Sequence, residues 1–464
     1  MNKRIGRLAA FFCALFLMLI GNLTYLQFIA VRDLTTRPEN VRPLLAEQRI
    51  QRGNIMTADG AILATSKKTS DGYLRLYPEG KITAPITGFY SKKYRRAGLE
   101  LQCDDYLTGQ SKLSSIDDYF MRLLGKESPG DSIILTLDMG LQRAAYRALG
   151  RQKGAVVALD PRTGKVLALV SKPSYDPNDI DTQWKTLAID PSGPLVNRAI
   201  KGKFTPGSSF KIITATAALE SGNVTTETVF KGPGSLHIYG GKVTNFESTS
   251  YNSLTFAQAF AKSVNTAFAR IGTDLGGSRL VGAAEAFGFN DKPPFDLPTA
   301  QSSIPPASQL DELEVAWSAV GQGRIQATPL EMALVASAVA HNGIIMRPYL
   351  IDKIVRHDGE VAFTQEPERW RSPMTKQTAQ TVKDLMVGVV EHGTGTRARI
   401  NSVTVAGKTG TAEVGSRAPH AWFVGFAPAE NPQIAVAVVV ENGGVGGRIA
   451  APIAKDVIEA ALCK

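Results

Sequence analysis

Residues 204–211 read Phe-Thr-Pro-Gly-Ser-Ser-Phe-Lys and place Ser208 three positions before Lys211. Thr205 suits a helix N-cap, and Pro206 suits the first helical position, where its missing amide hydrogen is not needed. A spacing of three on a helix puts two side chains on one face, so we expect the lysine amine to reach the serine hydroxyl. The stretch therefore predicts a helix start that carries an activated serine nucleophile with a lysine base.

The helix is expected to continue through the alanine-rich run Lys211–Glu220 and to stop near Gly222. A helix N-terminus favours negative charge, which eases deprotonation of Ser208 and disfavours a protonated amine beside it. Ser-x-x-Lys alone arises by chance about once in a chain of ordinary composition. An ordinary helix start is therefore the alternative until other motifs converge on it.

Two further motifs follow this one along the chain. Ser263-Val264-Asn265 comes 55 positions after Ser208 (263 − 208), and Lys408-Thr409-Gly410-Thr411 begins 145 positions later still (408 − 263). Taken alone, the first is a junction with two polar caps and the second is a bulge or edge of a strand. The glycines on both sides of Lys408 are poor strand formers, so we expect them to let a ligand approach the backbone.

The order Ser-x-x-Lys, Ser-x-Asn, Lys-Thr-Gly resembles the serine penicillin-binding proteins and the related serine β-lactamases. Other stretches look like landmarks of transpeptidase domains: Gly321-Gln322-Gly323, Ala327-Thr328-Pro329-Leu330, Gly393-Thr394-Gly395-Thr396 and Trp422–Pro428. Arg52-Gly53 and Gly98-Leu99-Glu100 resemble the non-catalytic module of class B penicillin-binding proteins. The resemblance covers nearly the whole chain and is closest to the short class B proteins of the PbpA type.

The resemblance implies a role for each motif residue. Ser208 would attack a carbonyl and Lys211 would take its proton, which gives an acyl-enzyme. Ser263 would extend that relay and later pass a proton to the leaving amine. The carboxamide of Asn265 both donates and accepts, which suits a substrate amide.

The strand motif is the expected binding site for a carboxylate. Lys408 would pair with the terminal carboxylate of a D-Ala-D-Ala stem peptide or of a β-lactam, and Thr409 and Thr411 would offer it hydroxyls. Gly410 belongs to the same substrate-binding run. The backbone amides of Thr411 and Ser208 would form the oxyanion hole.

Composition narrows the remaining classes. The chain has 464 residues, 44% of them hydrophobic and 20% charged, which is typical of two or three globular domains. The net charge of +10 comes from scattered basic residues without an arginine-rich or aromatic-interleaved basic run, so no nucleic-acid partner is expected. The five histidines form no His-Glu-x-x-His pattern, and neither a metal nor a cofactor is expected.

Three cysteines are present, at Cys13, Cys103 and Cys463, with no Cys-x-x-Cys pair. Cys13 lies in an apolar run, which leaves Cys103 and Cys463 as the only possible pair outside it. Their separation in sequence says nothing about geometry, so whether they pair stays open.

The N-terminus predicts a membrane anchor. Lys3, Arg4 and Arg7 precede a mostly apolar stretch over residues 8–30, about the length that crosses a bilayer. Basic residues on this side place the N-terminal tip in the cytoplasm and the rest outside. A cleaved signal peptide is the alternative, but the apolar run is long and no Ala-x-Ala site follows it.

We expect an α+β protein in three parts: an anchor (1–30), a small non-catalytic α+β module (31–130) and a penicillin-binding transpeptidase domain (131–464). Strand patterns at 154–159, 165–170, 403–405, 422–426 and 434–440 flank helical patterns that include 257–272 and 329–341. This order predicts an antiparallel sheet with helices, built from both ends of the last domain.

The leading hypothesis is a D,D-transpeptidase that cross-links peptidoglycan stem peptides and is inhibited by β-lactams. A D,D-carboxypeptidase is the first alternative, and a class D-type β-lactamase or penicillin sensor the second; those tend to carry Ser-x-Val where this chain has Ser263-Val264-Asn265. A third is a scaffold for a cell-wall polymerase, which the complete catalytic set argues against as the sole role. The resemblance also implies a SEDS-family glycosyltransferase as partner.

Overall fold

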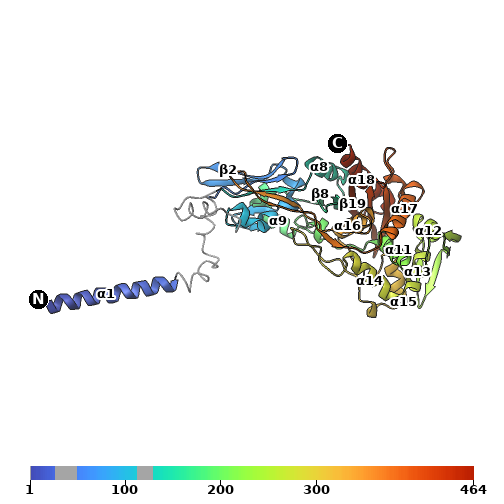
Figure 1. The fold of residues 1–464 in the computed structure, drawn as a ribbon, viewed down its shortest axis with the longest axis horizontal. Coiled ribbons are helices and arrows are strands. Elements are labelled where there is room, and N and C mark those ends of the chain that lie inside the picture. The colour runs from blue at the N-terminus through green and yellow to red at the C-terminus, as the bar shows by residue number, and fades with distance from the viewer. Residues whose placement is uncertain (1, 27–49, 112–128, 464) are drawn as a thin grey trace.

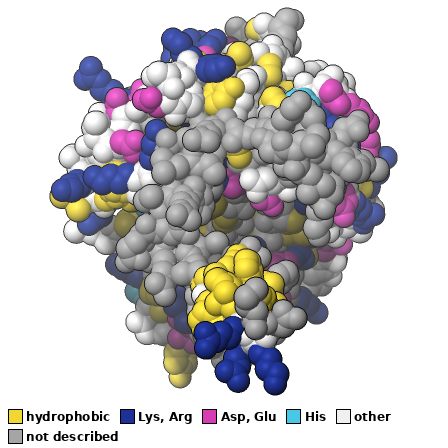
Figure 2. All heavy atoms as spheres, turned by 90° about the vertical axis from the view of Figure 1, so that its left-hand side faces the viewer, with side chains coloured by type: hydrophobic (Ala, Val, Ile, Leu, Met, Phe, Trp, Pro, Cys, Tyr) yellow, Lys and Arg dark blue, Asp and Glu magenta, His cyan; other side chains and the backbone are white. Residues whose placement is uncertain are grey.

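The first helix, α1, spans Asn2–Thr24 in the computed structural model, which describes residues 2–26, 50–111 and 129–463. Its 22-residue stretch Lys3–Thr24 is long and apolar enough to cross a membrane, since a bilayer core needs about 20 apolar residues. Figure 2 views the molecule from the side on which α1 lies in Figure 1. It shows the exposed apolar side chains of this helix as one group, beside lysine and arginine side chains. This confirms the expected apolar helix; residues 27–30 of the predicted anchor lie outside the described residues.

A five-stranded antiparallel sheet lies at the centre of the C-terminal part, as predicted. Its order is β17-β18-β19-β7-β8, and the strands are β7 Gly154–Leu159, β8 Val166–Lys172, β17 Ala406–Val414, β18 Arg417–Ala427 and β19 Ile434–Val440. Strand β19 pairs with both β18 and β7, so late strands join early ones. This leaves β17, which carries the Lys-Thr-Gly motif, at the edge of the sheet.

Helices cover both faces of this sheet (Figure 1). Helices α8 (Met139–Ala148) and α18 (Gly446–Leu462) share one core cluster with Val436 and Val438 of β19. Helix α16 (Pro329–Ala340) shares the other cluster with the alternate β19 residues, such as Ala437. Successive strand residues point to opposite faces, and both faces are covered, so the apolar run of β19 has no polar positions.

The helices of the middle region pack beside the sheet (Figure 1). They are α11 Lys211–Glu220, α12 Phe256–Ala261, α13 Asn265–Leu275, α14 Gly277–Phe287, α15 Glu312–Ala319 and α17 Lys376–His392. The helical pattern over 257–272 is divided between two helices, because the chain breaks between α12 and α13 at the Ser-x-Asn motif. Ser263 in the break has φ 57, in the left-handed region that a serine seldom adopts and no helix contains. Sequence also missed four short strands here: β9 Val229–Gly232, β10 Ser235–Ile238, β11 Gly241–Thr244 and β12 Tyr251–Thr255.

The start of α11 also differs from the prediction. The residues Gly207–Phe210 form a 3-10 turn, η4, with Pro206 at its N-cap, and α11 begins only at Lys211. Gly207 has φ 54, so the backbone cannot be α-helical from Pro206 onward. Thr205 does not cap the helix; its carbonyl instead accepts a hydrogen bond from Trp422 Nε1 at 3.0 Å.

A second sheet joins the N-terminal region to the rest of the chain. It has the order β15-β14-β6-β1-β2-β3, and its strands are β1 Ile55–Thr57, β2 Ile62–Thr69, β3 Gly72–Leu76, β6 Ser132–Leu135, β14 Ile351–Val355 and β15 Val361–Thr364. Strand β1 pairs in parallel with β6, and β6 pairs with β14. The sheet therefore draws strands from both sides of the expected boundary at residue 130.

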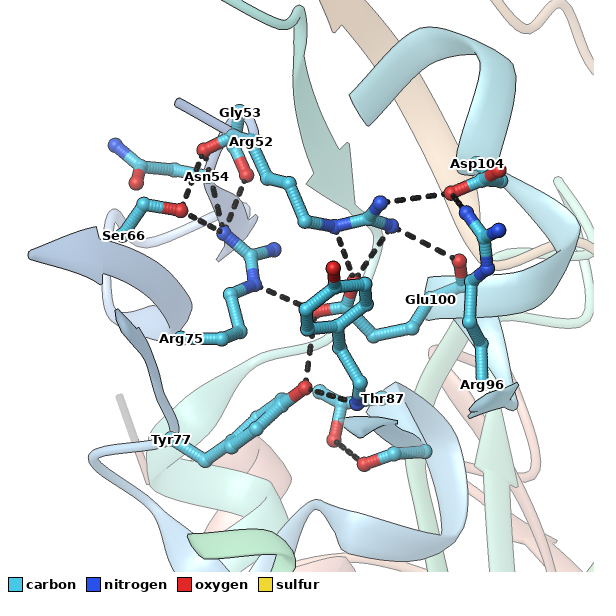
Figure 3. A network of polar contacts seen from close by, with 12 residues as sticks. Arg52, Gly53, Asn54, Ser66, Arg75, Tyr77, Thr87, Arg96, Glu100 and Asp104 are labelled. Carbon is cyan, nitrogen blue, oxygen red and sulfur yellow. Dashed lines mark hydrogen bonds and ion pairs between the residues drawn. The ribbon is translucent and has the colours of Figure 1, made fainter. Parts of the chain in front are cut away.

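Buried ion pairs hold the N-terminal region together (Figure 3). The completely buried carboxylate of Glu100 accepts hydrogen bonds from Arg52 Nη2 at 2.8 Å, Arg75 Nε at 2.6 Å and the Tyr77 hydroxyl at 3.2 Å. Asp104 binds Arg52 Nη1 at 2.7 Å. Burial alone would raise the pKa of Glu100, but the two guanidiniums hold it below its usual value. The two stretches that resemble a class B module thus meet in one ionic cluster.

The cysteines are free thiols in the structure, so Cys103 and Cys463 do not form a disulfide. Cys103 is buried beside α5 (Leu99–Gln102), and Cys463 is exposed after α18. Burial raises the pKa of the Cys103 thiol to about 12, which keeps it protonated and unreactive at neutral pH.

Candidate active site

The three motifs meet at the side chain of Ser263. Lys211 Nζ lies 3.2 Å from Ser263 Oγ, and Lys408 Nζ lies 2.8 Å from the same oxygen. Lys211 Nζ also donates to Ser263 O at 2.8 Å and to Asn265 Oδ1 at 2.7 Å. Residues separated by 52 to 197 positions (263 − 211 and 408 − 211) are therefore joined by one set of hydrogen bonds.

Ser208 lies at the second position of η4, half-buried, one turn before Lys211. Within the described residues its hydroxyl has no hydrogen-bond partner, so the expected bond between Lys211 and Ser208 is absent from this structure. The lysine amine is turned to Ser263 and Asn265 instead. The two residues are nonetheless on adjoining turns, because Lys211 is the C-cap of η4 and the first residue of α11.

The break between α12 and α13 positions Ser263 and Asn265. The α12 helix starts with a capping box in which Thr255 and Gln258 satisfy each other's backbone amides. After the break, Asn265 is the first residue of α13, and its Nδ2 donates to Thr244 O of β11 at 2.8 Å. The amide of Asn265 is thus held at both ends, with its oxygen aimed at Lys211.

Strand β17 brings Lys408, Thr409, Gly410 and Thr411 against the η4 turn. A Cβ on Gly410 would lie 2.7 Å from Pro206 O and 3.2 Å from Ser209 N. A Cβ on Gly407 would lie 2.3 Å from the Phe423 ring. Both glycines therefore make room for parts of the protein itself, where the sequence had suggested room for a ligand.

Two hydroxyls of β17 have partners on other elements. Thr409 Oγ1 lies 2.6 Å from Thr394 Oγ1, in the turn that follows α17. Thr411 Oγ1 accepts from the amide of Gly446 at 3.2 Å, at the first residue of α18. The Lys-Thr-Gly strand is therefore held by hydrogen bonds to the turn after α17 and to the start of α18, which lie 15 and 35 positions away in sequence.

Both lysines are completely buried, and this sets their protonation. Burial, together with the positive charge of Lys408, lowers the pKa of Lys211 well below its usual value. Burial lowers the pKa of Lys408 to about 7. A neutral Lys211 can donate to Ser263 O and Asn265 Oδ1 and keep its lone pair for a hydroxyl proton. The site therefore places a base (Lys211), a hydroxyl that can relay a proton (Ser263) and a cation (Lys408) near Ser208. These are the groups that acyl transfer by a serine requires.

Four contacts were not anticipated from the motifs. Thr394 was only a landmark, yet it contacts Thr409, and the backbone of Thr244 holds Asn265. His420 is half-buried on β18, with its Nδ1 accepting from Asn442 N at 3.0 Å and its ring edge-on to Phe204. These contacts give His420 a structural role. Sequence spacing does not predict these contacts, because the two residues of each contact come from different elements.

Comparison with known proteins shows the protein family to which the chain belongs. The family model of the penicillin-binding protein transpeptidase domain matches residues 154–459, and that of the penicillin-binding protein A dimerisation domain matches residues 52–133. The chain therefore belongs to the penicillin-binding protein transpeptidases, and the match at both ends makes it a class B member.

Within that family the chain is similar to PbpA proteins over its whole length. It is 39% identical to the peptidoglycan D,D-transpeptidase PbpA of Mycolicibacterium smegmatis, covering 100% of this chain and 99% of the relative. A ceftriaxone acyl-enzyme structure of penicillin-binding protein A from M. tuberculosis has a TM-score of 0.86 at 37% identity, covering 90% of this chain and 100% of that one. The D,D-transpeptidase domain of a peptidoglycan glycosyltransferase from Eggerthella lenta has a TM-score of 0.83 at 39% identity, covering 89% and 98%.

Proposed function

We propose that this chain is a peptidoglycan D,D-transpeptidase that works through a Ser208 acyl-enzyme and is acylated at Ser208 by β-lactams. The observation that carries the proposal is the pair of lysines, Lys211 and Lys408, on the one hydroxyl of Ser263. The similarity to a PbpA transpeptidase at 39% identity and to an acyl-enzyme structure supports the same chemistry.

Acylation begins at Ser208. Its Oγ forms a bond to the carbonyl carbon of the penultimate D-Ala of a stem peptide, and its proton passes to the neutral amine of Lys211. The backbone amides of Ser208 and Thr411 stabilise the oxyanion; losing one such donor typically costs roughly 100- to 1,000-fold in rate. The C–N bond then breaks, and the terminal D-Ala leaves as an amine that takes the proton of Ser263.

Lys211 returns a proton to Ser263, and the relay is restored. In the second half, the amine of a neighbouring stem peptide attacks the acyl-enzyme, loses its proton through the same relay and releases Ser208. A β-lactam stops at the first half, because the leaving amine stays tethered to the acyl group.

The substrate is held by the remaining motif residues. Lys408, with Thr409 and Thr411, binds the terminal carboxylate, and Gly410 lets this strand lie against the nucleophile's turn. Asn265 binds a substrate amide through its carboxamide, which can both donate and accept. The substrate takes the place of Lys211 at Oδ1 or of Thr244 O at Nδ2. Binding a carboxylate favours the charged form of Lys408 and so raises its pKa in the complex.

The same proposal covers location and partners. Residues 1–30 are a single-pass anchor with the N-terminal tip in the cytoplasm, 31–130 a non-catalytic module and 131–464 the catalytic domain outside the membrane. A SEDS-family glycosyltransferase is the proposed partner through the first two parts. Exchanging residues 1–30 for an unrelated spanning helix is expected to reduce co-purification with that partner, and undiminished co-purification would remove the anchor from the interface.

The experiment that tests the activity is incubation with a pentapeptide donor and an amine acceptor, with products separated by mass. A donor–acceptor adduct that appears together with free D-Ala is the expected result. A trimmed tetrapeptide as the only product, even beside a glycan polymerase, would make the chain a D,D-carboxypeptidase.

A further inference from the structure

The turn after α17 connects the two sides of the active site. It consists of residues 393–396, and the amide of Thr394 donates to Ala261 O at 3.2 Å, two positions before Ser263. The hydroxyl of the same residue lies 2.6 Å from Thr409 Oγ1 on β17. Thr394 thus contacts both the end of α12, just before the relay serine, and the strand that carries Lys408.

This turn is wedged tightly in place. A Cβ on Gly393 would lie 2.3 Å from Ala261 O, and a Cβ on Gly447 at the start of α18 would lie 2.3 Å from Thr394 O. Real Cβ atoms do not approach so closely, so glycine is required at both positions. The backbone of Thr394 therefore has little freedom, although the residue is exposed, and its hydroxyl meets that of Thr409.

The direction of the bond between the two hydroxyls matters for binding. Each threonine hydroxyl has one proton to donate, and Thr409 is almost fully buried, with 5% of it exposed. If Thr394 donates, then Thr409 accepts with its lone pair and keeps its own proton free for an anion. A hydroxyl that accepts a bond is also polarised into a stronger donor.

We propose that Thr394 is a positioning residue for carboxylate recognition: it donates to Thr409 and so directs the Thr409 proton toward the carboxylate bound by Lys408. The inference rests on the proposed function, in which that strand binds a carboxylate. Thr394 touches no reacting atom in this account and acts only through Thr409.

The test compares acylation by benzylpenicillin with acylation by its methyl ester, which has the same ring but no carboxylate. Thr394→Val keeps the shape and removes the hydroxyl, and Thr394→Ser keeps the hydroxyl. We expect Thr394→Val to lower the second-order acylation rate by benzylpenicillin about tenfold, the size of one hydrogen bond to a charged group. The rate with the ester should change less than twofold, and Thr394→Ser should restore most of the preference.

A purely structural role gives a different pattern. Equal losses with both probes in Thr394→Val, or an unchanged preference for the carboxylate, would overturn the proposal. If the valine variant melts below the assay temperature, Thr394→Ala against Thr394→Ser decides by the same ratio of rates. Failure of the proposed acyl-enzyme is distinguishable, because then the unmodified chain is not acylated by benzylpenicillin at all.

Discussion

Lys408 Nζ lies 2.8 Å from Ser263 Oγ, across the gap between the edge strand of the sheet and the break between two helices. Lys211 Nζ lies 3.2 Å from the same oxygen on its other side. When Lys211 is neutral, its lone pair can accept the Ser263 proton across this distance. A serine between two buried amines is a proton relay, because it accepts from one and donates to the other.

The relay predicts a large effect of Ser263→Ala. Loss of a positioned acid–base group typically costs on the order of 100- to 10,000-fold, so acylation by labelled penicillin should slow by that factor while the melting temperature is retained. Stopped-flow or gel labelling measures the rate. Ser253→Ala on exposed β12 is the matched control and should acylate normally. Acylation of Ser263→Ala within threefold of the unmodified rate would rule out the relay.

The pH dependence should report Lys408. The free enzyme needs Lys211 neutral and Lys408 charged, and the pKa of Lys408 is about 7 because of its burial. The second-order acylation rate with a carboxylate-bearing β-lactam should therefore fall as pH rises through about 7. Lys408→Arg keeps its charge far above this pH, so the alkaline limb should move upward in that variant even if the maximum is lower. An alkaline limb that stays in place would assign it to another group.

The ionic cluster of the N-terminal region should be essential for stability. Glu100→Gln leaves Arg52 and Arg75 buried without their shared carboxylate, and breaking a buried pair costs about 3–5 kcal/mol. Chemical denaturation of the full chain measures the loss in unfolding free energy. Asp274→Asn, which breaks the exposed pair with Arg270, is the control and should cost less than about 1 kcal/mol. Equal losses in the two variants would contradict this role of Glu100.

A buried carboxyl on α16 should make stability depend on pH. Glu331 is fully buried, neither of its oxygens has a hydrogen-bond partner in the described residues, and burial raises its pKa to about 8. The contribution of Glu331 to the free energy of unfolding is complete below the usual pKa of a glutamic acid. It is lost as pH rises toward 8, because Glu331 ionises at a lower pH in the unfolded chain than in the folded one.

Glu331→Gln removes this ionisation and should flatten the fall in melting temperature between about pH 5 and pH 8. Glu312→Gln, at an exposed position of α15, should leave the fall unchanged. An equally steep fall in Glu331→Gln would show that Glu331 is not the group responsible.

The sequence predicted the sheet better than it predicted the contacts of the candidate site residues. Short apolar runs bounded by turn residues locate β7, β8, β18 and β19, because local propensity and burial agree there. The identity of Ser208, Lys211 and Lys408 as neighbours came from motif order. That Lys211 bonds to Ser263 and leaves Ser208 free depends on the positive φ values at Gly207 and Ser263, which packing imposes.

Contacts between residues far apart in the chain could not be predicted from local sequence patterns. Glu100 and Arg52 are 48 positions apart, and Thr394 and Thr409 are 15 apart on different elements. No periodicity connects such residues. One signal was available: Glu331 is the single titratable group in the run Pro329–Ala340, in which only Ser337 is otherwise polar, and this marks a buried carboxyl.

The most direct measurement of the central claim is the mass of the peptide that contains Ser208 after incubation with penicillin. We expect one added penicilloyl group on that peptide, and no added mass anywhere in Ser208→Ala, whose melting temperature should match that of the unmodified chain. A penicilloyl group that persists in Ser208→Ala, or that maps to a different peptide, would contradict Ser208 as the nucleophile.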